Sequence, residues 1–206
     1  LGNANVELIT EDIRRIVPEG VMTNDGTVHA ADAIVFGTGF QVNDAEPPYE
    51  IVGKGGQGLG DLWKEGPECY LGTTSKGLPN LFFVIGPNTG IGHGSMIFMI
   101  ESQVRYITAC LASMVRKGAR HMEVRPEVQK EFNEKLQSRM SRTVWMSGCK
   151  SWYLDKFGRN PAMWPGFTFT FRRLTASVHE EDYIYSGSRP DPALAEAEAT
   201  GRRAWI

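Results

Sequence analysis

The middle of the chain, from Pro79 to Tyr106, combines an unbroken apolar run, a glycine-rich loop and a long periodic segment. The run at residues 81–85 (LFFVI) is typical of a short strand buried on both faces. The loop 88–94 carries three glycines, which permit positive φ angles and a close approach of a ligand to the main chain. Ser95 is the expected N-cap of a following helix. These features predict a strand that delivers a glycine loop to a helix N-terminus.

The periodic segment predicts a helix over residues 96–117. Apolar residues recur there at spacings of three and four, and we expect them to form its buried face: Ile97, Ile100, Val104, Ile107, Leu111 and Met114. Free N–H groups at the start of such a helix favour an electron-rich group. The segment can therefore form the floor of a ligand pocket. An ordinary strand-to-helix connection is the alternative, because a single glycine loop is a weak signal.

The first 40 residues predict a small β-meander over residues 5–36. Residues 6–10 alternate as a half-buried strand does, residues 13–17 and 21–23 follow as short strands, and 24–27 (NDGT) is a hairpin signal. Residues 32–36 (DAIVF) indicate a buried strand that ends in Gly37-Thr38-Gly39-Phe40. The two glycines around Thr38 indicate a backbone that passes close to another group. A plain tight turn is the alternative.

The remaining chain predicts two further helices and an aromatic loop. A short helix is expected near residues 59–64, and a longer one begins near Pro126. Residues 147–173 are rich in aromatic residues and glycine, which favours a lid or pocket wall, although its tryptophans can equally pin a loop to the core. Within it, residues 168–172 alternate as a strand does. Residues 187–206 form a polar tail in which a short helix is expected from Asp191.

Charge and composition exclude several classes of function. With a net charge of −2 over 206 residues, we expect neither a nucleic acid nor a membrane as a partner. No apolar run approaches the roughly 18 residues of a membrane helix. The cysteines are three and widely spaced, so the sequence predicts a reducing, cytoplasmic setting, no disulfide framework and no metal site. No Ser/His/Asp grouping or carboxylate pair stands out, so no catalytic residue is assigned.

Three segments resemble, in the expected order, motifs of one protein family. Residues 32–40 read DAIVFGTGF and resemble the Asp-x-x-Ile/Val-x-Ala/Gly-Thr-Gly-Phe/Tyr signature of class B flavoprotein monooxygenases. Residues 79–107 resemble the Pro-Asn-Leu-Phe … Gly-Pro … Glu-x-Gln segment of the same group. Residues 149–173 resemble the C-terminal loop of its Baeyer–Villiger and flavin-containing monooxygenase branch. The likeness covers about residues 5 to 185.

The resemblance implies an α/β fold, as the C-terminal part of a flavoprotein with two Rossmann-like dinucleotide-binding domains, for FAD and NADPH. Residues 1–40 would end the NADPH-binding domain, 41–185 would belong to the FAD-binding domain, and 186–206 would be a tail. In such enzymes NADPH reduces the flavin, and a flavin peroxide delivers one oxygen atom of O₂ to an organic substrate. A ketone undergoing Baeyer–Villiger oxidation is the leading expectation, with N- or S-oxygenation as the alternative.

The resemblance also implies which residues bind the cofactors. The loop that includes Asn88 and residues 90–96 would meet the pyrimidine edge of the flavin, and the helix dipole would stabilise its negative charge. Thr38, Gly39 and Phe40 would lie beside a cofactor where the chain returns to the FAD domain. Trp152 and Asn160 would lie near the nicotinamide cofactor or the mouth of the substrate pocket. The full set of expected cofactor-binding residues is Thr38, Gly39, Phe40, Asn88, His93, Gly94, Ser95, Met96, Trp152 and Asn160.

Several family motifs do not occur in the sequence. No GxGxxG motif with a following acidic residue is present, nor the Phe-x-Gly-x-x-x-His fingerprint, nor the arginine expected earlier in the Baeyer–Villiger branch. We therefore expect the missing N-terminal part of the same polypeptide to be a partner, and this chain alone to be inactive. A stand-alone binding module of the same fold is an alternative of another class. A piece of a disulfide reductase is disfavoured because no paired redox cysteines occur.

Overall fold

The computed structural model describes residues 2–39, 49–148 and 151–188. It divides into two compact units, residues 1–40 and 41–206, which are described separately. Within the described residues, no helix has both the length and the apolar character that a membrane crossing requires.

The first unit is a three-stranded antiparallel sheet in the order β1-β2-β3, with strands Ile13–Val17, Gly20–Thr23 and Val28–Ala30. The predicted hairpin signal is confirmed. Asp25 closes the turn, because its Oδ1 accepts a hydrogen bond from the Thr23 hydroxyl at 2.6 Å and one from the Thr27 amide at 2.9 Å. Two predicted strands are wrong, since residues 6–10 and 32–36 form none. Val35 is 93% exposed and Phe36 71%, so these apolar residues have no partner strand within the described residues.

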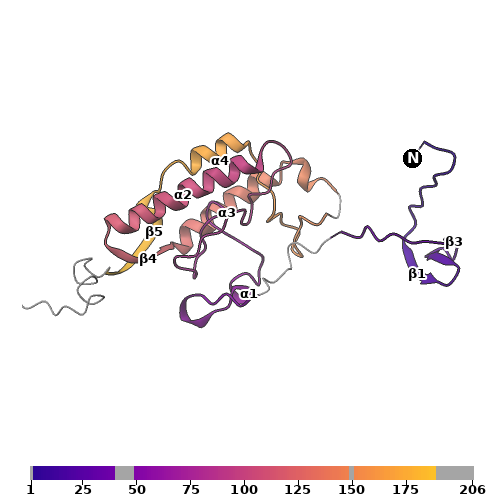
Figure 1. The fold of residues 1–206 in the computed structure, drawn as a ribbon, viewed down its shortest axis with the longest axis horizontal. Coiled ribbons are helices and arrows are strands. Elements are labelled where there is room, and N and C mark those ends of the chain that lie inside the picture. Colours follow the sequence, from indigo (N-terminus) through magenta and orange to yellow (C-terminus); the bar gives the residue numbers. More distant parts are fainter. Residues whose placement is uncertain (1, 40–48, 149–150, 189–206) are drawn as a thin grey trace, which may run out of the picture. The chain divides into compact units, whose positions relative to one another are not determined.

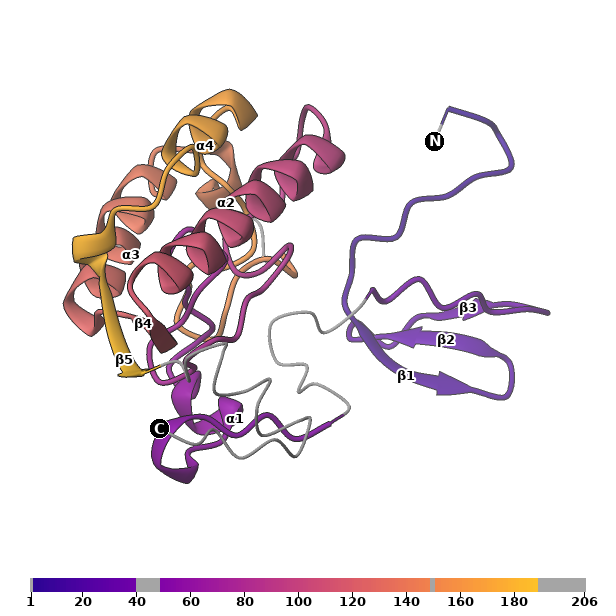
Figure 2. The ribbon, with the colours of Figure 1, turned by 60° about the vertical axis from the view of Figure 1, so that its left-hand side comes forward.

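The described part of the second unit is built from four helices and a strand pair (Figures 1 and 2). Its helices are α1 (Leu59–Leu62), α2 (Met96–Arg116), α3 (Pro126–Met140) and α4 (Thr168–Leu174), with single 3₁₀ turns η1 (Lys54–Gly56), η2 (Val144–Met146) and η3 (Glu180–Asp182). Strands β4 (Ala119–Val124) and β5 (Tyr183–Ser188) pair antiparallel. The predicted helices near 59–64, 96–117 and from Pro126 are thus confirmed.

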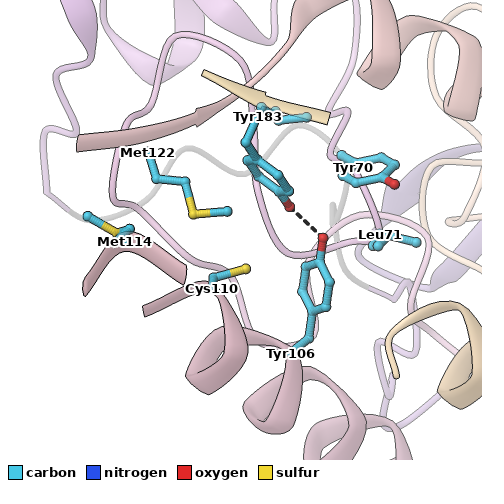
Figure 3. Close-up of a cluster of buried hydrophobic side chains, with 8 residues drawn as sticks. Tyr70, Leu71, Tyr106, Cys110, Met114, Met122 and Tyr183 are labelled. Carbon is cyan, nitrogen blue, oxygen red and sulfur yellow. Dashed lines mark hydrogen bonds between the residues drawn. The ribbon is translucent and has the colours of Figure 1, made fainter. Parts of the chain in front are cut away.

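Two buried clusters hold the second unit together. One lies between α2, β4 and β5 and contains three tyrosines, with the Tyr106 and Tyr183 hydroxyls hydrogen-bonded at 2.6 Å (Figure 3). Thr74 reaches the same Tyr183 hydroxyl at 3.2 Å. The other lies between the start of α2, the end of α3 and α4, around Met99, Met140 and Phe171. Together they fix α2 at both ends.

Two further predicted strands in this unit are wrong. Residues 81–85 form no strand, because their backbone bonds go elsewhere: the Phe83 amide donates to the Thr73 carbonyl at 2.8 Å and the Ile85 amide to the side chain of Gln103 at 2.9 Å. Residues 168–172 form the first turns of helix α4. The alternation of apolar and polar residues wrongly indicated a strand, because α4 is short and Phe171 is its only fully buried residue. The helix predicted from Asp191 lies outside the described residues.

The face of α2 that the chain buries differs from the predicted one. Periodicity predicted a core stripe that includes Ile97, Val104 and Leu111, yet these side chains are 64%, 48% and 49% exposed. The buried side chains of the helix are instead Met99, Ser102, Gln103, Tyr106, Cys110, Ser113 and Met114. Only Met114 of the predicted stripe is buried.

Glu180 ties η3 to the C-terminal end of α2 through three donors. Its carboxylate lies 2.9 Å from Lys117 Nζ and 2.9 Å from Arg116, and accepts a bond from the Ser113 hydroxyl at 3.1 Å. These hydrogen bonds, that of Lys117 first, lower the pKa of Glu180 from 4.5 to about 2. A lowered pKa in the folded state means that the stabilisation is complete above pH 4.5 and is lost as the pH falls through about 2.

We therefore expect Glu180→Gln to flatten the acid dependence of stability. Melting temperatures measured from neutral pH down to about pH 2 should fall less steeply in this variant than in the native protein. The exposed Glu134, 3.8 Å from Lys130, provides the matched substitution Glu134→Gln. An equal slope in the native protein and both variants would show that the Glu180 contacts do not form in solution.

Candidate functional site

The glycine loop ends at a capped helix N-terminus. Gly94 has a φ of 87°, a conformation that favours glycine, and it turns the chain into α2. The Ser95 hydroxyl then accepts a hydrogen bond from the Phe98 amide at 3.3 Å, which confirms the predicted N-cap. A helix start has four N–H groups without an intrahelical partner, so this cap leaves others free for a ligand. Residues 92–95 are exposed and accessible.

Hydrogen bonds join the glycine loop to the aromatic loop. Asn88 donates from Nδ2 to the carbonyls of Asn160 at 2.7 Å and Met163 at 3.0 Å, and its own amide donates to the Pro161 carbonyl at 2.6 Å. Gly90 then pairs with the next residues: its amide donates to Ala162, and its carbonyl accepts from Trp164. Asn88 and Asn160 are almost fully buried. Two segments more than 70 residues apart in sequence thus form one rigid wall.

Hydrogen bonds of Gln103 fix the segment that precedes the glycine loop. Gln103 of α2 is fully buried, and its Oε1 accepts from the Ile85 amide at 2.9 Å. Its Nε2 donates to the carbonyl of Gly72 at 2.8 Å and to the Thr73 hydroxyl at 3.1 Å. Ile85 has a φ of 57°, which is strained for a β-branched residue. Residues held in such conformations cluster at functional sites.

Both loops line one apolar cavity of about 540 Å³. Trp63 and Phe83 form one side, with ring centroids 5.2 Å apart. The remaining lining includes Ile85, Gly90, Met96, Trp152 and Met163. A mainly apolar pocket with a few polar groups is typical of a site for a small organic molecule or a cofactor. The cavity has the character of a binding site, with no evident acid–base pair.

Two buried donors at this wall lack a hydrogen-bond partner within the described residues. They are Nε1 of Trp63, which lines the cavity, and Nδ2 of Asn160, in the aromatic loop. A buried donor without a partner is costly, and in native structures it often marks a place for a ligand or a water molecule. The wall therefore offers hydrogen-bond donors to an acceptor-rich ligand.

The structure brings most of the predicted site residues together. Asn88 contacts Asn160 directly, and Met96 lines the same cavity as Trp152. Next to them, His93 packs on Phe167 with ring centroids 5.7 Å apart, and a Cβ on Gly94 would lie 3.2 Å from Thr168. Thr38 and Gly39 belong to the first unit, whose placement relative to the second is not determined, and Phe40 lies outside the described residues.

The described residues offer little for metal or thiol chemistry. No group of three or more His, Cys, Asp or Glu side chains that could hold a metal occurs among them. Burial raises the pKa of the Cys110 thiol to about 12 and that of Cys69 well above its ordinary value. Burial therefore disfavours the thiolate, which is the reactive form, at both cysteines.

Comparison with known proteins places the chain among flavin-dependent oxygenases. No protein-family model matches it. A Baeyer–Villiger monooxygenase of Pseudomonas aeruginosa is 48% identical over 185 residues, which is 89% of this chain and 35% of that protein. An FAD-binding monooxygenase of Aspergillus niger is 35% identical over 205 residues, covering 97% of this chain and 33% of that protein. The crystal structure of cyclohexanone monooxygenase from Rhodococcus sp. Phi1 bound to NADP⁺ superposes with a TM-score of 0.69 at 30% identity, covering 85% of this chain and 34% of the other.

The chain is related to the class B flavoprotein monooxygenases. It spans about a third of the length of the curated monooxygenases it matches. The predicted α/β class agrees with these neighbours, and the described part is a mixture of helices and short strands.

Sequence reasoning missed three residues of this candidate site. Hydrophobic periodicity could not identify Gln103, because a single polar residue on a helix is usually predicted to face solvent. Trp63 lies in a stretch rich in glycine and charged residues that carries no site motif, and Met163 is one of several apolar residues within the aromatic loop. Each is brought to the site by contacts between distant segments. The Glu-x-Gln part of the family motif was the one available pointer to Gln103.

Proposed function

We propose that this chain is the C-terminal part of an FAD- and NADPH-dependent monooxygenase that inserts one oxygen atom of O₂ into a ketone. The observation that carries the proposal is the wall formed by the glycine loop, the start of α2 and the aromatic loop around one apolar cavity. The relatives supply the chemistry, since one is named a Baeyer–Villiger monooxygenase, one FAD-binding, and one structure contains NADP⁺.

The described residues fit an isoalloxazine ring at this wall. The exposed residues 92–95 approach a ligand with main chain, and a 21-residue helix points its positive end at the same place. The unpartnered donors of Trp63 and Asn160 suit a ring bordered by carbonyl and nitrogen acceptors. Gly94, Ser95 and Met96 would hold the pyrimidine edge of the flavin, and Trp152 and Asn160 would lie towards NADPH or the substrate. Bound flavin and NADPH would supply the activation of O₂ and the electrons.

The chain's own residues would bind, orient and exclude water. Helix α2 would stabilise negative charge near its N-terminus by its dipole and free amides. Trp63, Phe83 and Met163 would keep the cavity apolar, which disfavours water and suits a ketone with a hydrocarbon frame. The Asn88 and Gln103 networks would hold the loops in position, so the site needs no rearrangement of its main chain to accept a ligand.

The full-length protein tests the proposal directly. It should purify yellow with bound flavin and consume NADPH faster when a cyclic ketone is present, with a lactone or ester as the product. Product mass and connectivity from a ketone and from a thioether would distinguish Baeyer–Villiger oxidation from S-oxygenation. A colourless protein with no ketone-dependent NADPH consumption would contradict the proposal and favour a binding module of the same fold.

Gly94→Val should impair flavin retention in the full-length protein. The positive φ of Gly94 strains any side chain, and a β-branched one would crowd both Thr168 and the approach to the first turn of α2. The flavin-to-protein ratio after gel filtration measures the effect. Gly118→Val provides the control, because Gly118 also has a positive φ, of 60°, but lies at the far end of α2 with open space around it. Equal flavin content in both variants would place the cofactor elsewhere.

A further inference from the structure

A group of charged side chains joins the aromatic loop to residues 66–68. Arg159 is at its centre: its Nε lies 3.0 Å from Oδ2 of Asp155, and its Nη1 lies 3.3 Å from Oε1 of Glu68. The Arg159 guanidinium also lies over the ring of Phe157, 5.4 Å from the ring centroid. We call Arg159, Asp155 and Glu68 the Arg159 junction. Its three side chains are not among those that line the apolar cavity.

On the side of the aromatic loop, Asp155 makes residues 155–159 a rigid turn. The Asp155 side chain is only 4% exposed, and its Oδ1 accepts hydrogen bonds from the amides of Phe157 at 2.9 Å and Arg159 at 2.8 Å. Its own amide donates to the Arg159 carbonyl at 2.8 Å. Breaking an ion pair that holds a buried charge is strongly destabilising. The Arg159 side chain is therefore held in one position by the carboxylate that it neutralises.

On the other side of the junction, Glu68 is fixed to the core of the second unit. Its carbonyl accepts hydrogen bonds from the Ser75 hydroxyl at 3.2 Å and from Nε2 of Gln129 at 3.4 Å. Both of these donor side chains are buried. The junction therefore connects the aromatic loop to a segment that is itself anchored.

The main chain at Gly66 is shaped to receive the junction. Gly66 has a φ of 103°, and a Cβ at this position would collide with the Arg159 guanidinium and lie 2.8 Å from Oδ2 of Asp155. Glycine allows both the backbone conformation and the close approach of the ion pair. This fit is an observation independent of the ion pairs, and it shows that Arg159 packs tightly against the segment.

The two segments that the junction joins both supply walls of the apolar cavity. Pro67 lies between Gly66 and Glu68, and Pro161 follows Arg159 by two positions. The lining residues from these segments are Trp63, Pro67, Trp152, Pro161, Ala162 and Met163. Isolated surface ion pairs contribute little, but a planar guanidinium that contacts two carboxylates and a ring fixes orientation as well as distance. A change at Arg159 would therefore move the two walls relative to one another.

We propose that Arg159 is a positioning residue that sets the width of the apolar cavity and hence the size of the ketone that it admits. The inference rests on the proposed function for the class of substrate. Arg159 acts through the lining residues on either side of it, without touching the cavity itself. Small changes in width matter, because one methylene group in an apolar pocket changes kcat/KM by roughly 10–200-fold.

Arg159→Met in the full-length protein tests the proposal. We expect the ratio of kcat/KM for a bulky cyclic ketone to that for a small one to rise by about tenfold, because the walls are no longer held together. Arg159→Lys should give an intermediate ratio, since lysine keeps the charge but lacks the planar fork. Arg116→Met is the matched control: Arg116 pairs with Glu180 at 2.9 Å, at the end of α2 opposite to the cavity-lining Met96. It should leave the ratio unchanged.

Cleavage by chymotrypsin gives a second readout that needs neither substrate nor cofactor. Phe157 is 57% exposed in the rigid turn, and loss of the junction should make cleavage within the aromatic loop several times faster in Arg159→Met but not in Arg116→Met. If Arg159→Met does not fold, Arg159→Lys carries both comparisons.

Three outcomes separate the possibilities. An unchanged cleavage rate with an unchanged ratio would show that Arg159 does not position the loop. Faster cleavage with equal losses of kcat/KM for both ketones would restrict Arg159 to a structural role. A native protein that oxidises neither ketone would contradict the proposed function, and the cleavage rates would then still decide whether Arg159 positions the loop.

Discussion

Asn88→Ala is expected to separate the glycine loop from the aromatic loop and to lower the free energy of unfolding by about 3 kcal/mol. The substitution removes both Nδ2 hydrogen bonds, so the Met163 carbonyl loses this donor, while the Asn160 carbonyl keeps the one from Gln137 Nε2 at 3.0 Å. It also places alanine at a φ of 57°, a conformation that asparagine tolerates better. Both effects act on the wall of the cavity.

We expect Asn88→Ala to lower both the stability of the protein and its binding of ligand. Chemical denaturation of the full-length protein measures the first. Under the proposed function, the second is a lower flavin-to-protein ratio, because Asn88 sets where residues 90–96 lie relative to the aromatic loop. A loss of stability without any loss of flavin would restrict Asn88 to a structural role.

Two further variants separate the contributions. Asn80→Ala is the matched control, since Asn80 also has a positive φ, of 60°, and also donates to a carbonyl, that of Arg120, but away from the cavity. It should destabilise the fold and leave flavin retention unchanged. Asn88→Gly keeps the backbone conformation while removing the amide, so it isolates the hydrogen bonds from the strain.

Local signals in the sequence were sufficient for the elements that depend on local chemistry. Ser95 caps α2 as predicted, and the turn at Asn24–Thr27 follows from its residue types. The strands at residues 32–36 and 81–85 were wrong because an apolar run shows a need for burial and not what satisfies it. In the described structure the amides of Phe83 and Ile85 bond to a loop and a side chain, which no local pattern encodes.

The same limit applies to the candidate site. The glycine loop and the aromatic loop were each recognisable, and the family resemblance related them to flavin and NADPH. Their contact through Asn88 and Asn160 required coordinates, because it joins residues 72 positions apart. Periodicity predicted a buried face of α2 that includes Ile97, Val104 and Leu111, and in the described structure these side chains are exposed. The helix itself could be predicted from its local pattern, but the face that it buries depends on contacts with distant segments.

Gln103→Leu is the second substitution with a large expected effect, also on the order of 3 kcal/mol. Leucine has nearly the volume of glutamine but can neither accept from the Ile85 amide nor donate to the Gly72 carbonyl. The Gly72 carbonyl would be left unsatisfied in a buried place and the Ile85 amide in a partly buried one, and an unsatisfied buried group costs about 1–3 kcal/mol. Denaturation of the full-length protein, compared with the exposed substitution Arg105→Leu on the same helix, gives the measurement.

The strain at Ile85 makes this prediction more specific than a loss of packing. Gln103 holds the Ile85 amide while that residue keeps its left-handed conformation, and Ile85 lines the cavity. Glycine adopts that conformation freely, so Ile85→Gly should reduce the harm of Gln103→Leu. We expect the double variant to lose less stability than the sum of the two single losses, by about 1 kcal/mol. If the losses simply add, Gln103 supports the fold without constraining Ile85, and the cavity rim must be set by other contacts.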